Sequence, residues 1–138
     1  DQPGGKNLIG AFHQPVAVCG DLATLRTLPR RELVAGLAEV IRSAAAFDAG
    51  FFAFLEGNLE ALLAVEPAAL RHAVATCCRI KGSIVAGDER ETTGRRSLLN
   101  LGHTFGHALE TLTGYTRYRH GEAVGWGMVR AARLAARL

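Results

Sequence analysis

The chain has very little lysine. Of the 16 basic residues among its 138 residues, only Lys6 and Lys81 are lysines, and the rest are arginines. A compact ammonium is not interchangeable with a guanidinium fork, so both lysines are candidate functional residues. The net charge is only +3, and the basic residues are spread along the chain. This excludes the basic stripe typical of a nucleic-acid-binding protein and favours a small anionic partner.

Cysteine and long apolar runs are also scarce. The three cysteines, Cys19, Cys77 and Cys78, form no C-x-x-C pair, which indicates a reduced, cytoplasmic chain. The N-terminal residues 1–5 lack the basic-then-apolar pattern of a signal peptide. No apolar run approaches the roughly 20 residues that cross a membrane. We therefore expect a cytoplasmic protein without a membrane partner.

Aromatic residues make up only 7% of the chain, whereas apolar residues as a group make up 49%. From Pro29 onward the apolar residues recur every three or four positions, which predicts helices. A polar, glycine-containing loop is expected over 88–96. The predicted helices cover 29–47, 67–87, 98–112 and 121–138. Between the first two, a further helical segment is capped by Asp48 and interrupted at Gly57-Asn58.

The N-terminal part has a different pattern. Residues 7–19 favour two short strands, or a strand and a loop, and Asp21 is a plausible cap for a short helical turn. The expected fold class is thus mainly α, with a short β segment at the N-terminus. No further strand is expected between residues 40 and 130. Both ends of the sequence look cut, because it starts in a loop and stops inside a periodic helix.

Three of the five histidines lie within 18 residues. His103 and His107 are four positions apart and project from one helix face, and His120 follows after a glycine-containing break. Imidazole is the commonest protein ligand for zinc, and a catalytic zinc site uses three protein ligands with one open position. The alternative is that these histidines cap helices or lie in the core.

Glu39 lies in the apolar stretch 36–41. A carboxylate is costly to bury there unless it is paired or bound to a metal, so Glu39 is a candidate oxygen ligand. The alternative is a glutamate at the edge of the apolar face. One carboxylate with two imidazoles would leave an open position on zinc for a substrate.

A series of six motifs makes the interpretation more specific. Together they resemble the motif series of the 3-dehydroquinate synthase family, over nearly the whole chain. In order, they are Gly5-Lys-Asn-Leu-Ile-Gly-Ala-Phe-His-Gln-Pro15, Thr27-Leu-Pro-Arg-Arg-Glu32, Gly36-Leu-Ala-Glu-Val-Ile41, Asp88-Glu-Arg-Glu91, Leu99-Asn-Leu-Gly-His-Thr-Phe-Gly-His-Ala108 and His120-Gly-Glu-Ala-Val124.

The resemblance implies two domains. Residues 1–28 would end a nucleotide-binding domain and form a connecting β segment. Residues 29–138 would form a helical domain that binds metal and substrate and is truncated at its C-terminus. A homodimer is expected for the full-length parent. Without the remainder of the first domain, apolar side chains near residues 8–18 should be exposed or covered by self-association.

The resemblance also implies site residues. It gives Glu39, His103 and His120 as ligands of Zn²⁺ or Co²⁺, and His107 a role in the substrate and proton network. Contacts with NAD are implied for Lys6, Thr24, Leu25, Arg26 and Thr27. Contacts with the hydroxyl, carboxylate or phosphate groups of the substrate are implied for Asn7, Lys81, Arg96 and Asn100.

The family reaction converts a seven-carbon sugar acid, 3-deoxy-D-arabino-heptulosonate 7-phosphate, into 3-dehydroquinate with release of phosphate. It is a step of the shikimate pathway, which leads to the aromatic amino acids. NAD transiently oxidises one alcohol of the substrate, which permits the loss of phosphate, and an intramolecular aldol step later closes the carbocycle. Much of the NAD site is expected to be absent from this segment. The isolated chain should therefore bind NAD weakly and should not convert the substrate, although zinc binding should persist.

Two departures from the family pattern leave more than one function open. Arg42 replaces the usual lysine after Glu-Val-Ile, which makes any proton-shuttle role at this position doubtful. The loop 91–96 has one extra residue, so Arg95 could replace Arg96 as the anion contact. Related sugar-phosphate cyclases share much of this motif set, so the chain could belong to one of them. It could also be a polyol dehydrogenase-like metal domain or an inactive metal-binding fragment.

Overall fold

The computed structural model describes residues 9, 10, 13, 15–88 and 94–138, with the side chains of 95 and 96 excepted. Helices dominate this part of the chain, and it contains no strand. The elements are the 3-10 turn η1 (Leu22–Thr27), α1 (Arg30–Phe47), α2 (Ala49–Gly57), α3 (Leu59–Leu63), α4 (Pro67–Gly87), the 3-10 turn η2 (Arg95–Asn100), α5 (His103–Leu112) and α6 (His120–Ala135).

Local signals in the sequence set most of these boundaries. The Asp48 carboxylate accepts a hydrogen bond from the backbone N–H of Phe51 at 2.8 Å, which caps α2. The expected interruption separates α2 from α3 at Asn58. Pro67 occupies the first turn of α4, where its missing N–H costs nothing. Asp21 caps η1 by accepting from the N–H of Ala23. These predictions are confirmed.

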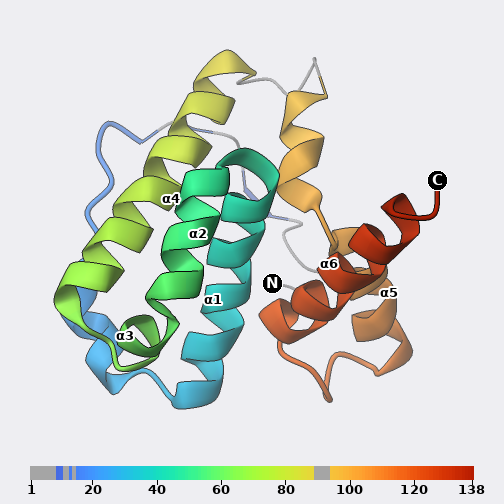
Figure 1. Cartoon of the computed structure of the whole chain (residues 1–138), viewed down its shortest axis with the longest axis horizontal. Coiled ribbons are helices and arrows are strands. Elements are labelled where there is room, and N and C mark those ends of the chain that lie inside the picture. Colours follow the sequence, from blue (N-terminus) through green and yellow to red (C-terminus); the bar gives the residue numbers. More distant parts are fainter. Residues whose placement is uncertain (1–8, 11–12, 14, 89–93) are drawn as a thin grey trace.

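The hydrophobic core lies where α1, α2, α3 and α4 meet (Figure 1). Its buried members share small or aliphatic character apart from one aromatic ring; they are Leu37, Ala44, Phe51, Leu55, Leu62, Ala69, Leu70 and Ala73. Helices α5 and α6 form a hairpin on the other side of α1, and Ala123 and Val124 of α6 are fully buried. Helix α1 therefore contributes to both packing regions.

The start of α5 differs from the prediction. A helix was expected from about residue 98, but residues 95–100 form a 3-10 turn and α5 begins at His103. Gly102 explains the break, because its φ of +83° is left-handed and cannot continue a helix. At the other end of the hairpin, α6 runs from His120 to Ala135, close to the prediction of 121–138.

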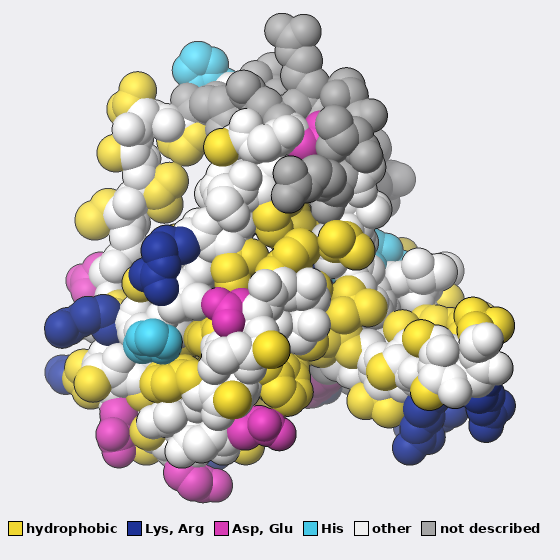
Figure 2. All heavy atoms as spheres, turned by 45° about the horizontal axis from the view of Figure 1, so that its top comes forward, with side chains coloured by type: hydrophobic (Ala, Val, Ile, Leu, Met, Phe, Trp, Pro, Cys, Tyr) yellow, Lys and Arg dark blue, Asp and Glu magenta, His cyan; other side chains and the backbone are white. Residues whose placement is uncertain are grey.

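The N-terminal segment is described only in part. No strand is assigned to the described residues before η1, so the expected short β segment is not confirmed. The expected apolar exposure is confirmed at Ile9, Val16 and Val18, and Figure 2 shows hydrophobic side chains standing out along the extended segment at the left edge of the molecule. Among the described residues, no helix is long and apolar enough to span a membrane.

Candidate metal centre and adjoining cleft

Close packing brings the first turn of α6 against α1. A Cβ added at Gly121 would lie only 1.9 Å from the carbonyl oxygen of Ala35, so only glycine fits there. Two ion pairs reinforce this contact. Arg31 Nε lies 2.6 Å from Glu122 Oε1, and Arg119 Nε lies 2.7 Å from Glu32 Oε1. His120, which precedes Gly121, is thereby held beside the helix that carries Glu39.

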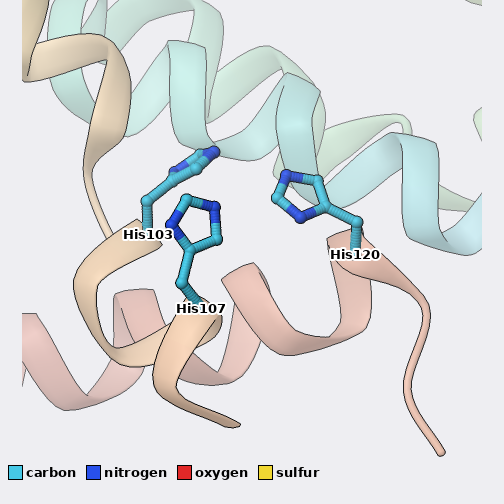
Figure 3. A group of neighbouring side chains, drawn as sticks. All are labelled: His103, His107 and His120. Atoms are coloured by element: carbon cyan, nitrogen blue, oxygen red, sulfur yellow. The ribbon is translucent and has the colours of Figure 1, made fainter. Parts of the chain in front are cut away.

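Three imidazoles converge between α1, α5 and α6 (Figure 3). The ring centroid of His103 lies 5.3 Å from that of His107 and 5.2 Å from that of His120. One ring nitrogen from each of the three lies within 4.8 Å of the others, a spacing that could hold a metal ion. The residues His103 and His107, on one face of α5, thus meet His120 from the start of α6.

Glu39 joins this cluster from α1. Its Oε1 lies 3.6 Å from His120 Nε2 and 3.8 Å from His103 Nε2. Both separations are too long for hydrogen bonds. The oxygen is nevertheless buried and has no hydrogen-bond partner among the described residues, an arrangement that is costly unless a cation satisfies it.

The donor set fits a zinc ion. Two ligands about 2.1 Å from a tetrahedral zinc lie roughly 3.4 Å apart, close to the two separations from Glu39. An anionic oxygen facing two imidazole nitrogens is also the ligand chemistry that zinc prefers. The geometry brings the three predicted ligands together. It also places His107 in the cluster, so distance alone does not separate the three-histidine set from the set with Glu39.

Burial affects the protonation of His103. Removal of the ring from water lowers the pKa of His103 below its usual value, while the nearby Glu39 carboxylate partly opposes this shift. The neutral imidazole, which is the form that binds metals, is therefore favoured.

Arg42 holds the other oxygen of Glu39. Its Nε donates to Glu39 Oε2 at 2.9 Å, and its Nη1 donates to the carbonyl of Leu99. The guanidinium therefore connects α1 with η2 and orients the carboxylate so that Oε1 faces the histidines. The sequence had marked Arg42 only as a departure from a family pattern. Its position three residues after Glu39, one helical turn away, was the available signal for this ion pair.

Glu110 is a second carboxylate that the sequence interpretation missed. It lies in the last turn of α5 and is buried, and its Oε1 and Oε2 are 3.2 and 3.3 Å from His120 Nδ1. Its spacing of three residues from His107 places it near the histidine face of α5. That spacing, together with an acidic residue in an amphipathic helix, was the only signal in the sequence.

A cleft of about 490 Å³ opens beside the candidate metal centre. Its volume is in the range of small-molecule sites. Lys81 from α4 and Asn100 from η2 line it together with Glu39, Arg42 and His103. Two residues with predicted substrate contacts therefore share one cavity with two predicted metal ligands. Cys77 and Cys78 also line it, and burial raises the pKa of the Cys77 thiol.

Of the residues implied in NAD binding, the four in η1 do not line this cleft. Figure 1 places η1 beside the start of α4, on the far side of the core from α5 and α6. The Thr24 and Thr27 hydroxyls donate to backbone carbonyls of the same turn, Arg26 is exposed, and Leu25 packs against the core. Lys6, Asn7 and the side chains of Arg95 and Arg96 lie outside the described part of the chain.

Comparison with known protein families shows which family this chain belongs to. The model of the 3-dehydroquinate synthase C-terminal domain matches residues 36–138, and that of the N-terminal domain matches residues 1–35. The chain belongs to the 3-dehydroquinate synthase family. The change of model at residue 36 falls inside α1, and the predicted domain division after residue 28 stays a prediction.

Two relatives show how much of a family member this chain represents. A 3-dehydroquinate synthase of Citrifermentans bemidjiense is 60% identical over 135 residues, which are 98% of this chain and 37% of the relative. A 3-dehydroquinate synthase of Geobacter sp. strain M21 is 58% identical over the same shares. The chain therefore spans little more than a third of the length of these relatives.

Proposed function

We propose that this chain is the metal- and substrate-binding part of a 3-dehydroquinate synthase, which converts 3-deoxy-D-arabino-heptulosonate 7-phosphate into 3-dehydroquinate and phosphate. The supporting observation is the cleft in which Glu39 and His103 meet Lys81 and Asn100. Membership of the family favours this reaction over that of a polyol dehydrogenase.

Glu39, His103 and His120 would hold the zinc ion, which supplies polarisation of a substrate alcohol and stabilisation of negative charge on its oxygen. His107, the exposed member of the cluster, would remain free to exchange protons with the substrate. NAD is the second cofactor that the family resemblance implies. Of the residues expected to contact NAD, Lys6 lies outside the described part of the chain.

The walls of the cleft would bind and orient the substrate. The Lys81 ammonium matches a carboxylate or phosphate group, and the Asn100 amide can donate to one substrate oxygen and accept from a hydroxyl. The Arg42 guanidinium is held by Glu39 and Leu99, so it adds positive charge to the wall while keeping a fixed position. Such positioning lowers the entropic part of the barrier in an intramolecular ring closure.

A chimeric enzyme tests this proposal. The chain would replace the matching 135 residues of the Citrifermentans bemidjiense relative, and phosphate release would be measured with zinc and NAD. We expect turnover of the heptulosonate phosphate, and a reduction of at least 10-fold in kcat/KM for Lys81→Met, about the effect of one charge-assisted hydrogen bond. A chimera that is inactive on the heptulosonate phosphate but converts another sugar phosphate would instead assign the chain to a related cyclase.

A further inference from the structure

The buried Glu110 has a specific partner. Both of its carboxylate oxygens lie within hydrogen-bond distance of the single atom His120 Nδ1, and only 10% of the side chain is exposed. Among the described residues, His120 is the only hydrogen-bond partner of this carboxylate. A carboxylate buried to this extent needs such a partner, because its desolvation is costly.

This contact fixes which nitrogen of His120 carries the proton. An ionised carboxylate can only accept hydrogen bonds, so Nδ1 must be the donor. In a neutral imidazole the other nitrogen, Nε2, then has a free lone pair. That nitrogen is the one that lies 3.6 Å from Glu39 Oε1 in the metal cluster. Glu110 and Glu39 thus contact opposite nitrogens of the same ring.

We propose that Glu110 is the positioning residue of the metal centre: it holds His120 as the Nδ1–H tautomer, with Nε2 presented to the metal. This proposal rests on the metal centre put forward above. A carboxylate that accepts from the second nitrogen of a ligating histidine fixes the ring orientation and raises the basicity of the ligand. Glu110 does not itself contact the metal or the substrate.

The alternative is that Glu110 only connects α5 with α6. In that case its removal would lower the stability of the chain but leave the tautomer of His120 and the intrinsic zinc affinity of the folded protein unchanged. The two roles therefore differ in what they predict for the folded chain without metal, where the tautomer can be read directly.

The experiment uses the 138-residue chain and the variants Glu110→Gln and Glu110→Ala, with Glu60→Gln at an exposed position of α3 as the control. Long-range ¹H–¹⁵N NMR spectra of the metal-free chain would report the tautomer of His120. Titration with Zn²⁺ against a chromophoric chelator would give the affinity, and thermal unfolding without metal would report stability.

We expect the Nδ1–H tautomer in the unchanged chain and a shift toward Nε2–H in Glu110→Ala, with zinc affinity reduced by about 10- to 100-fold. Glu110→Gln keeps the shape and one acceptor oxygen, so its loss of affinity should be smaller, and it remains informative if Glu110→Ala does not fold. Glu60→Gln should match the unchanged chain.

Two results would overturn the proposal, and they are distinguishable. Unaltered zinc affinity and an unaltered His120 tautomer in both Glu110 variants would remove the positioning role while leaving the metal centre intact. An unchanged chain that binds no zinc would instead contradict the metal centre itself, and the role of Glu110 with it.

Discussion

At the scale of single residues, the ligand set of the metal centre is the first property to test. We expect His103→Ala to reduce zinc affinity by more than about 100-fold, since loss of a ligand should exceed the effect of losing a residue that only orients one. His107→Ala should leave most of the affinity intact. The measurement is a competition titration with a chromophoric chelator, with circular dichroism as the control for folding.

The same titration separates the two possible ligand sets. Glu39→Gln should behave like His103→Ala, because Oε1 of Glu39 is the buried oxygen that faces both histidine nitrogens. If His107→Ala lost as much affinity as His103→Ala while Glu39→Gln lost none, the three histidines alone would be the ligands.

Arg42 provides a second prediction at this scale. Its guanidinium donates to both Glu39 Oε2 and the Leu99 carbonyl. A lysine ammonium lacks the planar fork that reaches two such acceptors at once. We expect Arg42→Ala to weaken zinc binding by about 10-fold or more, and Arg42→Lys to have an intermediate effect. Arg71→Ala, at an exposed position of α4, is the control. Equal zinc affinities in the unchanged chain and Arg42→Ala would show that Glu39 needs no such support.

At the scale of helices, glycine determines how closely α6 approaches α1. Gly121→Ala would place a methyl group 1.9 Å from the Ala35 carbonyl oxygen, so α6 must move away and carry His120 with it. We expect a destabilisation of about 1–3 kcal/mol or more and a marked loss of zinc affinity. Urea unfolding and zinc titration would measure the two effects.

Gly125→Ala is the matched control on the same helix. Among the described residues, its new Cβ would meet only the Ala38 Cβ, at 3.7 Å, which is ordinary contact. Because alanine is the better helix former by up to about 1 kcal/mol, this variant should be as stable as the unchanged chain or more stable. Similar destabilisation in both variants would mean that the close contact at Gly121 does not set the position of α6.

The connection between α1 and α6 also predicts a dependence of stability on pH. A side-chain hydrogen bond from Arg31, and then the backbone N–H of Arg119, lower the pKa of Glu122 from 4.5 to about 2. Since the folded value lies below the unfolded one, the stabilisation is fully present above pH 4.5 and is lost as the pH falls from 4.5 toward 2.

Glu122→Gln should therefore lower the Tm at neutral pH and flatten its decrease over this acidic range. Thermal unfolding followed by circular dichroism, from neutral pH down to about pH 2, would compare it with the unchanged chain. The exposed Glu60→Gln variant should keep the full decrease. An unaltered acid slope in Glu122→Gln would show that this ion pair does not contribute to stability.

At the scale of the whole molecule, this chain should retain zinc binding without retaining catalytic turnover. The residues of the candidate metal centre all lie within this chain. The described residues that are expected to contact NAD, by contrast, belong to the short turn η1, which has no buried residue. We expect the chain alone to bind zinc but to release no phosphate from the heptulosonate phosphate with NAD present. Isothermal titration with NAD should show weak or no binding. Clear turnover by this chain alone would contradict the division of the site between two domains.

Much of the helical architecture could be predicted from the sequence because its signals are local. Asp48, Pro67 and the Gly57-Asn58 pair set helix boundaries through contacts with residues a few positions away. The start of α5 was predicted less well, because Leu98, Leu99 and Leu101 suit a helix while the left-handed backbone of Gly102 separates η2 from α5. The residue types of Glu39, His103 and His120 also indicated metal chemistry before any fold was known.

Only the tertiary structure decided which of these groups meet. The approach of Glu39 to two histidines more than 60 positions away depends on the close contact at Gly121 and on ion pairs between α1 and α6. The contacts of Arg42 with Leu99 and of Glu110 with His120 arise in the same way, from packing between different elements. Helix periodicity and capping are properties of neighbouring residues and can be read along the chain, whereas the distance between two helices is set by side chains and backbone atoms that are remote in sequence.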